Sequence, residues 1–416
     1  MYDLVVVGGG ITGVSAAVSA ARCGLSVLLI EKGGSLGGAA CHAYVNPFMP
    51  YKVKLDGKRR NISDGIFTEI IDKLSSMDGL NENLQTFSEE ILKLILDDMC
   101  IEAGVKVLFH SYLTSAKCEN GRIKTLTVAT KGGPLTFEAS YFIDATGDAD
   151  LSVLSGCAYN IGRETDHQCQ PMTLCFRLAG IDKEKFNQEA KEEINELYKK
   201  LLSEGKLLNP RENILLFPYD ADGVLHFNTT RVIRKCPVDA FDVSEAEIEA
   251  RKQVYEMYKL LKENARGCEN ATLLSTAPEI GVRQSRQIQG EYILTTEDLK
   301  ALTKFPDRIA ACNYDIDVHS PDGSGTSHYY FGDGEYYTIP YRSLIPKEIK
   351  NLLVAGRCIS STFEAQASYR IMPVCATLGQ AAGIAASVAL KSNCDAVDAD
   401  VAEIQKLLTE AGAFIG

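Results

Sequence analysis

Apolar and polar positions at the start of the chain fall into blocks that fit a strand, a helix and a second strand. Residues 4–7 are apolar and rich in valine, and residues 14–22 carry small and apolar side chains at helical spacing. Gly24 supplies a helix stop, and residues 27–30 form another short apolar run. This pattern predicts a βαβ unit with buried strands.

The next part of the chain predicts a helix followed by an antiparallel meander. Residues 86–103 have helical spacing and end at Gly104, and the segment "VKVLFHSYLTSAKC" follows as a strand. Two further segments of alternating polarity, "RIKTLTVAT" and "LTFEASYFIDATG", are separated by Gly132 and Gly133. We therefore expect antiparallel strands inserted in a parallel α/β arrangement.

The pattern changes beyond about residue 160. Charged helical segments appear at residues 182–206 and 244–267, and we interpret their polar positions as solvated outer faces. Between them, residues 214–233 predict a hairpin that turns at Asp222 and Gly223. Near the C-terminus, "NLLVAGRCISST" predicts a buried strand, and "RIMPVCATLGQAAGIAAS" predicts a loop followed by a tightly packed helix.

Both ends of the chain therefore have the character of one nucleotide-binding domain. We expect this domain to comprise residues 1–160 and 336–416, with an inserted substrate domain at residues 161–335. A chain of 416 residues and 45.4 kDa exceeds what one core usually supports. The predicted fold class is α/β, a Rossmann-like domain with a parallel sheet and an antiparallel meander plus an inserted α+β substrate domain.

Composition and charge exclude several classes of function. The net charge is −12, and the only concentrated basic run is "KVKLDGKRR", so nucleic acid is not an expected partner. The thirteen cysteines are odd in number and none forms C-x-x-C, which argues against a disulfide framework and a metal site. The apolar segment at residues 375–390 is short and rich in alanine and glycine, so we expect a buried helix and no membrane association. No secretory signal precedes the first strand, which predicts a cytoplasmic protein.

The first apolar run ends in a glycine motif that fits a bound pyrophosphate. Gly8 turns the chain out of the strand, Gly10 lets the backbone approach the phosphates, and Gly13 lets the helix pack against the sheet. The phosphates then lie at a helix N-terminus, where N–H groups point outward. Glu31 ends the second strand at the position of a ribose-binding acid, which completes a dinucleotide-binding unit.

Motifs spread over the whole chain carry a resemblance to a known family. They are the glycine motif with Glu31, followed by Gly37 and Gly38, the segment "FIDATGDADL", and the segment "LLVAGRCISSTFEAQASYRIMPVCATLGQAAGIAA". Together with "QPMTLCFRLAGID", "GVRQSRQIQGEYILTTEDL" and "YDIDVHSPDGSG", they resemble FAD-dependent oxidoreductases of the glutathione reductase-type class, on the branch of fumarate reductase flavoproteins. NAD is the alternative for the first motif alone, but a nicotinamide dehydrogenase needs neither residues 144–148 nor residues 351–386.

The resemblance implies an FAD site built from both ends of the chain. Glu31 is expected on the adenosine ribose, the three glycines at the pyrophosphate, and Thr146 and Gly147 beside it. The Gly37–Gly38 turn and a helix start near residues 377–380 are expected to approach the flavin ring, where a helix N-terminus stabilises the reduced anion. The full set of expected cofactor residues is Gly8, Gly10, Gly13, Glu31, Lys32, Gly37, Gly38, Ala145, Thr146, Gly147, Gly356, Arg357, Thr377, Gly379 and Gln380.

Four polar residues are candidates for the chemistry beside the flavin. Arg283 and Arg286 could anchor a carboxylate or stabilise developing negative charge, or else form salt bridges with nearby carboxylates. His319 has a side chain whose ordinary pKa suits proton transfer, and a loop-capping role is its alternative. Arg370 precedes the "IMP" loop and could bind flavin or substrate. We expect all four side chains to converge on one face of the flavin ring.

Cys41 and His42 follow the Gly37–Gly38 turn, where either could bond covalently to FAD. We favour a buried small residue and a packed imidazole, and hence noncovalent FAD. The predicted activity is hydride transfer between flavin N5 and a small organic substrate, such as one that bears a carboxylate, at the domain junction. The alternatives are a flavoprotein subunit that passes electrons to a protein partner and a noncatalytic flavin-binding protein.

Overall fold

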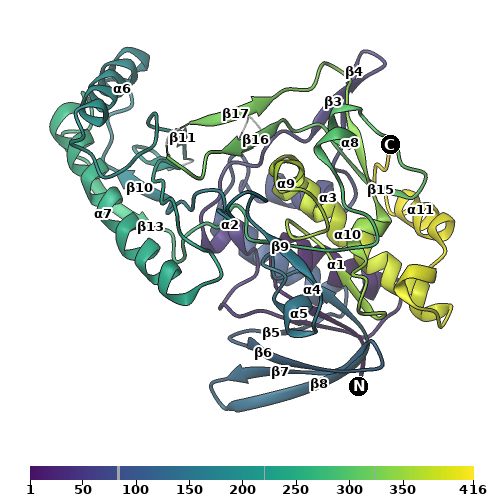
Figure 1. The fold of residues 1–416 in the computed structure, drawn as a ribbon. Coiled ribbons are helices and arrows are strands. Elements are labelled where there is room, and N and C mark those ends of the chain that lie inside the picture. Colours follow the sequence, from purple (N-terminus) through teal and green to yellow (C-terminus); the bar gives the residue numbers. More distant parts are fainter. Residues whose placement is uncertain (82–84, 220, 324) are drawn as a thin grey trace.

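The computed structural model describes residues 1–81, 85–219, 221–323 and 325–416, and its fold is shown in Figure 1. Its large sheet has the strand order β5-β2-β1-β8-β7-β6, with β19 also paired to β8. These strands are β1 (Tyr2–Val7), β2 (Val27–Ile30), β5 (Lys106–Leu108), β6 (Tyr112–Glu119), β7 (Arg122–Thr130), β8 (Gly133–Asp144) and β19 (Leu352–Val354).

Strand β8 belongs to two kinds of sheet. Its first half pairs antiparallel with β7, which pairs antiparallel with β6. Its second half pairs in parallel with β1 on one side and with β19 on the other, while β2 continues the parallel part beyond β1. The predicted parallel sheet with an attached antiparallel meander is therefore confirmed.

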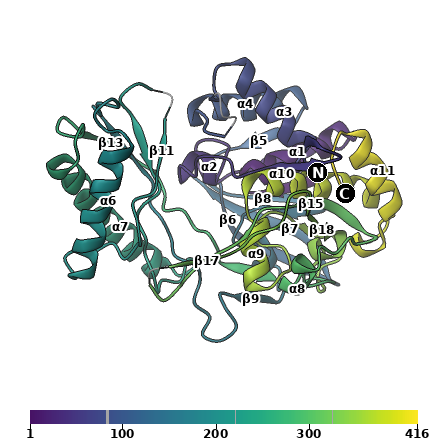
Figure 2. The same cartoon turned by 90° about the horizontal axis from the view of Figure 1, so that it is seen from above.

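Two helices from opposite ends of the chain pack closely beside the parallel strands. They are α1 (Ile11–Arg22) and α10 (Met372–Lys391), and both are drawn close together in Figures 1 and 2. A Cβ atom on Gly379 would lie 2.1 Å from the carbonyl oxygen of Thr12, and one on Gly383 would lie 2.2 Å from that of Ala16. The two helix backbones therefore touch, which only glycine at these positions of α10 allows.

Helix α10 is long and apolar enough to cross a membrane by length and composition alone. Within the described residues it is the only helix of this kind, and 94% of its most apolar stretch is buried inside the protein. Its apolar character is explained by contacts with α1 and the sheet, as expected for a core helix.

The inserted part has its own antiparallel sheet and its own core. The sheet order is β11-β12-β10-β13, and the predicted hairpin is confirmed as β11 and β12, with Gly223 at a φ of +64° in the turn. Helices α6 and α7 cover one face and form a separate wing in Figure 2. The elements are β10 (Phe176–Ala179), β11 (Leu216–Pro218), β12 (Leu225–Phe227), β13 (Thr272–Thr276), α6 (Gln188–Ser203) and α7 (Ala240–Asn264).

Helix α7 begins earlier than its charge pattern predicts. Asp239 caps it and accepts hydrogen bonds from the backbone N–H groups of Phe241 and Asp242. Helix α6 begins later than predicted, after Asn187, whose side chain accepts from the N–H of Ala190. In both cases a side-chain cap fixes the residue at which the helix begins. The spacing of apolar residues alone does not reveal that residue.

The remaining elements complete the fold. The helices are α2 (Ala39–His42), α3 (Ile66–Ser76), α4 (Glu89–Glu102), α5 (Asp150–Leu154), α8 (Thr296–Lys300), α9 (Phe363–Tyr369) and α11 (Val401–Glu410), with 3-10 turns at Tyr341–Leu344 and Ala396–Asp398. The strands are β3 (Lys52–Leu55), β4 (Lys58–Asn61), β9 (Tyr159–Ile161), β14 (Arg286–Ile288), β15 (Arg308–Cys312), β16 (Ile316–His319), β17 (Thr326–Tyr329) and β18 (Tyr337–Pro340).

The hydrophobic cores divide the chain differently from the expected domain limits. The core of the inserted part contains buried side chains from Met172 to Ile280. Leu294, Phe305 and Ile309 lie in the core of the nucleotide-binding part, although the pattern places them in the insertion. The limits at residues 161 and 335 stay a prediction.

Contact between α1 and α10 makes the fold sensitive to one added methyl group. We expect Gly379→Ala to lower the free energy of unfolding by about 1–3 kcal/mol, because its Cβ would meet a backbone carbonyl that cannot move aside. Gly132→Ala is the matched control, since its Cβ would meet only the Thr130 hydroxyl at 3.9 Å. Thermal or denaturant unfolding of both variants measures the difference. Equal stability of the two variants would contradict the close packing.

Candidate cofactor and active site

The carboxyl ends of four parallel strands meet at one edge of the large sheet. Val7 of β1 pairs with Ile30 of β2 and with Asp144 of β8, and Asp144 also pairs with Val354 of β19. The segments after these strands therefore start side by side, at the edge where open α/β sheets bind ligands. They contain the predicted cofactor residues Gly8, Gly10, Glu31, Lys32, Ala145, Thr146, Gly147, Gly356 and Arg357.

The glycine turn fits a pyrophosphate. A Cβ on Gly8, which has a φ of +101°, would lie 2.4 Å from the carbonyl oxygen of Ala145, and one on Gly13 would lie 1.8 Å from that of Gly8. Close packing therefore requires both glycines. At Gly10, by contrast, the nearest atom to a Cβ is the Cα of Gly38, at 3.8 Å. The open space beside Gly10 adjoins the N-terminus of α1, where phosphates are stabilised.

The Gly37–Gly38 turn packs directly on this glycine turn. The N–H of Gly37 donates to the carbonyl oxygen of Gly9 at 2.9 Å, and Gly37 forms a parallel bridge with Gly10. A Cβ on Gly38, which has a φ of +50°, would lie 2.8 Å from the Cα of Gly10. The two turns that the sequence assigns to the cofactor therefore form one backbone cradle.

Glu31 is 4% exposed and lies against the same turn. Its two carboxylate oxygens accept hydrogen bonds from the N–H groups of Gly9 at 2.7 Å and Gly33 at 2.6 Å. Each oxygen keeps a second lone pair, so the carboxylate can also accept ribose hydroxyls. Lys32 turns away and forms an ion pair with Glu279 of the inserted part at 2.9 Å.

The segment after β8 is held in place by its own acids. Buried Asp144 accepts hydrogen bonds from the backbone N–H and hydroxyl of Thr146 and from the N–H and hydroxyl of Ser152. Asp148 pairs with Arg357 at 2.7 Å, and a Cβ on Gly147 would lie 2.8 Å from that guanidinium. The Nε atom of Arg357 is buried and has no hydrogen-bond partner among the described residues, which leaves a donor for a ligand at this edge.

Helix α10 starts earlier than the sequence analysis placed it. It begins at Met372, with Pro373 in its first turn, where the missing N–H of proline costs nothing. Thr377, Gly379 and Gln380 consequently lie inside the helix and not at its N-terminus. The hydroxyl of Thr377 donates to the carbonyl of Val374, so this side chain is also engaged within the helix.

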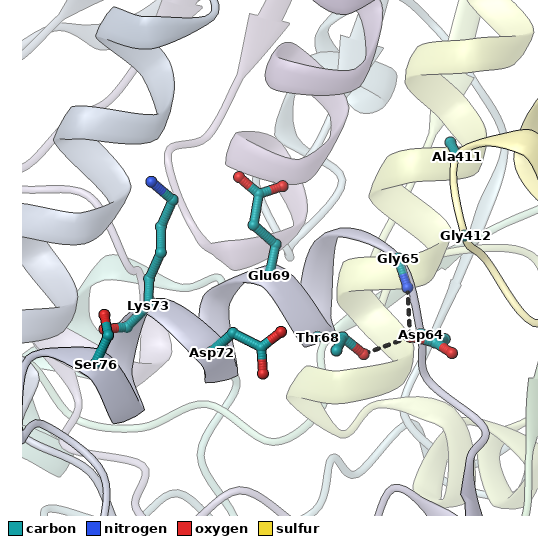
Figure 3. A pocket seen from close by; sticks show the side chains of 9 residues that line it. All are labelled: Asp64, Gly65, Thr68, Glu69, Asp72, Lys73, Ser76, Ala411 and Gly412. Carbon is teal, nitrogen blue, oxygen red and sulfur yellow. Dashed lines mark hydrogen bonds between the residues drawn. The ribbon is translucent and has the colours of Figure 1, made fainter.

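Gln380 connects α10 to α3. Its Oε1 accepts from the N–H of Ile66 at 3.1 Å, and its Nε2 donates to the carbonyl of Ala411 at 3.3 Å. The side chain is next to Gly65 and Ala411, which help to line a shallow cavity of about 500 Å³ (Figure 3). Contacts within the protein therefore engage the side chain of Gln380. The lining of this cavity contains none of the predicted cofactor or catalytic residues.

Cys41 and His42 are packed as expected. The Cys41 side chain is buried, and burial raises the pKa of its thiol to about 12. The Nε2 atom of His42 lies 3.0 Å from the hydroxyl of Ser35. A thiol that stays protonated at neutral pH is a poor nucleophile toward a flavin.

Three of the four candidate catalytic residues are brought together, and the fourth is not. Arg370 and His319 both contact the Oδ2 atom of Asp317, each at 3.3 Å. Arg283 lies close enough to Arg370 for the charge of Arg370 to lower the pKa of Arg283. We call Arg211, Arg231, Arg283 and Arg370, together with Asp317 and His319, the arginine cluster.

Arg286 lies apart from the arginine cluster and contacts a different segment, and the convergence of all four side chains on the flavin ring stays a prediction. Its Nη1 atom donates to the carbonyl of Asp148 and to the carboxylate of Asp150 at 3.0 Å. Residues three apart point in different directions in the extended segment that leads into β14, so Arg286 and Arg283 face different neighbours. Burial and the charges of Asp148 and Asp144 raise the pKa of Asp150 to about 6.

Arg283 is fixed by uncharged groups. Its Nη1 atom donates to the carbonyl of Pro171 at 2.7 Å and to the hydroxyl of Thr173 at 2.6 Å. Burial, followed by the charges of Arg370, Arg211 and Arg231, lowers the pKa of Arg283 to about 9. The guanidinium remains protonated at neutral pH, and no carboxylate of the described residues forms an ion pair with it.

His319 is not a near-neutral acid or base in this environment. It is 8% exposed, and burial together with the charge of Arg283 lowers its pKa to about 3. The imidazole is therefore neutral across the physiological range, in contrast to the expectation from its ordinary pKa.

Three buried arginines that no sequence motif reveals complete the site. Arg211 and Arg231 are 5% and 1% exposed, and both come from segments without a recognisable motif. Arg177 of β10 is stacked between the rings of Tyr44 and Tyr219, at 4.2 and 4.1 Å from their centroids. It also pairs with Glu89 of α4, so it joins the inserted sheet to the nucleotide-binding part. Long side chains that reach from one part to another leave no local signal in the sequence.

A parallel sheet with a glycine cradle and a buried acid at its carboxyl edge defines a dinucleotide-binding protein. The chain matches the FAD dependent oxidoreductase family over residues 3–408, and it belongs to that family. It is thus an FAD-dependent oxidoreductase, and FAD is the dinucleotide that the cradle fits.

Curated relatives resemble only part of the chain. It is 31% identical over 159 residues to the digeranylgeranylglycerophospholipid reductase of Methanocella arvoryzae, covering 35% of this chain and 39% of that protein. It is 30% identical over 160 residues to the mitochondrial dihydrolipoyl dehydrogenase of Schizosaccharomyces pombe, covering 35% of this chain and 28% of that protein. The matches thus span well under half of either relative.

A solved structure aligns over a larger share of the chain. It is that of a geranylgeranyl bacteriochlorophyll reductase-like protein from Thermoplasma acidophilum. The alignment covers 98% of this chain and 82% of that one, with a TM-score of 0.48 and 13% identity.

Glycine substitutions separate cofactor binding from folding. We expect Gly10→Ala to fold but to weaken FAD binding at least about 100-fold, or about 2.7 kcal/mol, because its methyl group enters open space that the pyrophosphate needs. Gly13→Ala should instead destabilise the protein itself, since its Cβ meets a carbonyl oxygen. Flavin absorbance per protein and unfolding of the apoprotein measure the two effects. Normal FAD content in Gly10→Ala would show that the pyrophosphate does not bind beside Gly10.

We expect FAD to be noncovalent, because Cys41 is a protonated thiol and His42 is hydrogen-bonded to Ser35. Acid precipitation of the holoprotein should release the yellow colour into the supernatant. Colour that stays in the pellet, and is lost in Cys41→Ala or His42→Ala, would show a covalent bond to that residue.

Proposed function

We propose that the protein transfers a hydride between flavin N5 and a small organic anion that binds at the arginine cluster. Two arginines without ion-pair partners carry this proposal. Among the residues that the structure describes, Arg231 pairs with Glu212 and Arg370 pairs with Asp317, whereas neither Arg211 nor Arg283 has a carboxylate within 4.0 Å. A carboxylate of the substrate is the group that guanidinium ions bind best.

The energetics of burial support an anionic substrate. Uncompensated charge in a buried position costs several kcal/mol, and a bound anion removes that cost. The Nε and Nη1 atoms of Arg211 are buried without hydrogen-bond partners, as is the Nε atom of Arg370. Unpaired donors of this kind favour a ligand with several acceptor oxygens.

The place of the cluster supports a site at the junction of the two parts. Arg211, Arg231 and Arg283 come from the inserted part, whereas Arg370 follows α9, next to the first turn of α10. These residues would bind and orient the substrate and hold its negative charge during transfer. We also propose that the protein belongs to the branch of fumarate reductase flavoproteins, because its terminal and central segments resemble that branch.

Organic acids and their uncharged amides, compared in pairs, test whether the substrate is an anion. Anaerobic holoprotein, oxidised or reduced, is mixed with small organic acids and with the corresponding uncharged amides, and flavin absorbance is followed. We expect at least one acid to change the redox state of the flavin while its amide does not. Equal reaction of acids and amides would contradict the anionic substrate.

Arg283 offers a variant for the same test. We expect Arg283→Gln to retain FAD but to slow flavin reduction or reoxidation by that acid by about 100-fold or more, because a charge-assisted anchor is lost. Arg266→Gln is the control, since Arg266 forms exposed ion pairs with Glu189 and Glu193 on α6. An unchanged rate in Arg283→Gln would assign Arg283 to structure.

A further inference from the structure

We propose that Arg231 is a positioning residue that holds His319 as a neutral hydrogen-bond donor to Asp317 and thereby fixes the orientation of Arg370. The inference rests on the proposed function, because Arg370 is one of the groups offered to the substrate. It also gives His319 a different role from the proton transfer that its residue type suggests.

Contacts of Arg231 determine which nitrogen of His319 carries the proton. The Nη2 atom of Arg231 lies 3.1 Å from the Nδ1 atom of His319. A guanidinium has N–H donors and no acceptor, so Nδ1 must be the unprotonated, accepting nitrogen. The proton of the neutral imidazole is therefore on Nε2.

Three side chains donate hydrogen bonds to Asp317, and His319 is one of them. Nε2 of His319 lies 3.3 Å from the Oδ2 atom of Asp317, and its N–H donates to that oxygen. The hydroxyl of Tyr314 donates to the same oxygen at 3.2 Å, and the Nη2 atom of Arg370 at 3.3 Å. Asp317 therefore receives three donors, and one of them is the side chain that faces the proposed substrate.

Arg231 is itself held firmly enough to act in this way. It is 1% exposed, and its Nη1 atom donates to the carbonyls of Gly323 and Gly325, each at 3.1 Å. Its guanidinium also pairs with Glu212 at 3.3 Å. Arg231 thus connects the segment after β12 to the loop between β16 and β17, and it cannot rotate without breaking these contacts.

The groups around His319 keep the imidazole neutral. Positive charges face it from the segment after β12 (Arg231), from the segment before β14 (Arg283) and from the end of α9 (Arg370). Asp317 on its own strand is the opposing carboxylate, and the hydroxyl of Thr326 on β17 lies 3.1 Å from Nδ1. Burial and Arg283 dominate this balance and lower the pKa of His319.

Nitrogen NMR of the FAD-loaded protein tests the assignment without any substrate. In protein labelled with ¹⁵N-histidine, the signals of His319 are those absent from His319→Asn. We expect a protonated Nε2 and a bare Nδ1, unchanged between about pH 5 and about pH 9, a range in which an ordinary histidine titrates. A protonated Nδ1, or a titration within this range, would overturn the proposal.

Two variants separate Arg231 from its neighbour. In Arg231→Gln, the new amide can donate or accept, so we expect His319 to populate both tautomers or to begin titrating. Thr326→Val is the matched control, because it removes the other group that contacts Nδ1. It also removes one contact of Arg231 Nη2, at 3.3 Å, but keeps those of Arg231 with Gly323, Gly325 and Glu212, so the wild-type spectrum should persist. Arg231→Lys keeps a donor and should restore the wild-type tautomer.

The possible results are distinct. An unchanged spectrum in Arg231→Gln, or an equal change in Thr326→Val, would contradict the proposal that Arg231 sets the tautomer of His319. If Arg231→Gln does not fold, the spectra of the wild type and of Arg231→Lys still test the predicted tautomer of His319. If no organic acid reacts with the flavin but the tautomers behave as expected, the proposed function fails and the positioning role stands.

Discussion

The parallel pairing of β8 with β1 and β19 is the constraint on which the rest of the structure depends. It joins segments more than one hundred residues apart and brings the ends of β1, β2, β8 and β19 to the same level. Contact between α1 and α10, through Gly379 and Gly383, fixes the returning end of the chain beside the first βαβ unit. A cofactor cradle made of backbone atoms follows from this arrangement, because each loop starts at a strand end.

The second organising feature is an excess of buried positive charge. Four guanidinium groups gather around Asp317 and Glu212, and His319 adds no charge because burial and Arg283 lower its pKa. An uncompensated arrangement of this kind is costly for the fold, and this cost is the basis of the proposal that an anion binds here. The fold tolerates it because carbonyl and hydroxyl groups, such as those of Pro171 and Thr173, fix the guanidinium groups.

Local geometry explains where the structure differs from the pattern of the sequence. Arg283 and Arg286 resemble a pair, yet Asp148 and Asp150 hold Arg286 beside the segment after β8. A helix start was expected near residues 377–380, yet proline is accepted in the first turn of a helix, and α10 begins at Met372 with Pro373 in that turn. His319 suggested a titrating group, but its pKa depends on burial and on the charges of Arg283 and Arg370 from two other segments.

The sequence by itself determined the βαβ unit, the meander, the inserted hairpin and the glycine cradle, because apolar periodicity and glycine motifs act over a few residues. It also determined the family, whose motifs extend along nearly the whole chain. Only the tertiary structure decided which polar side chains meet. Arg231, His319 and Asp317 join Arg370 through contacts between distant segments, and such contacts depend on how the sheets and helices pack and not on any local pattern.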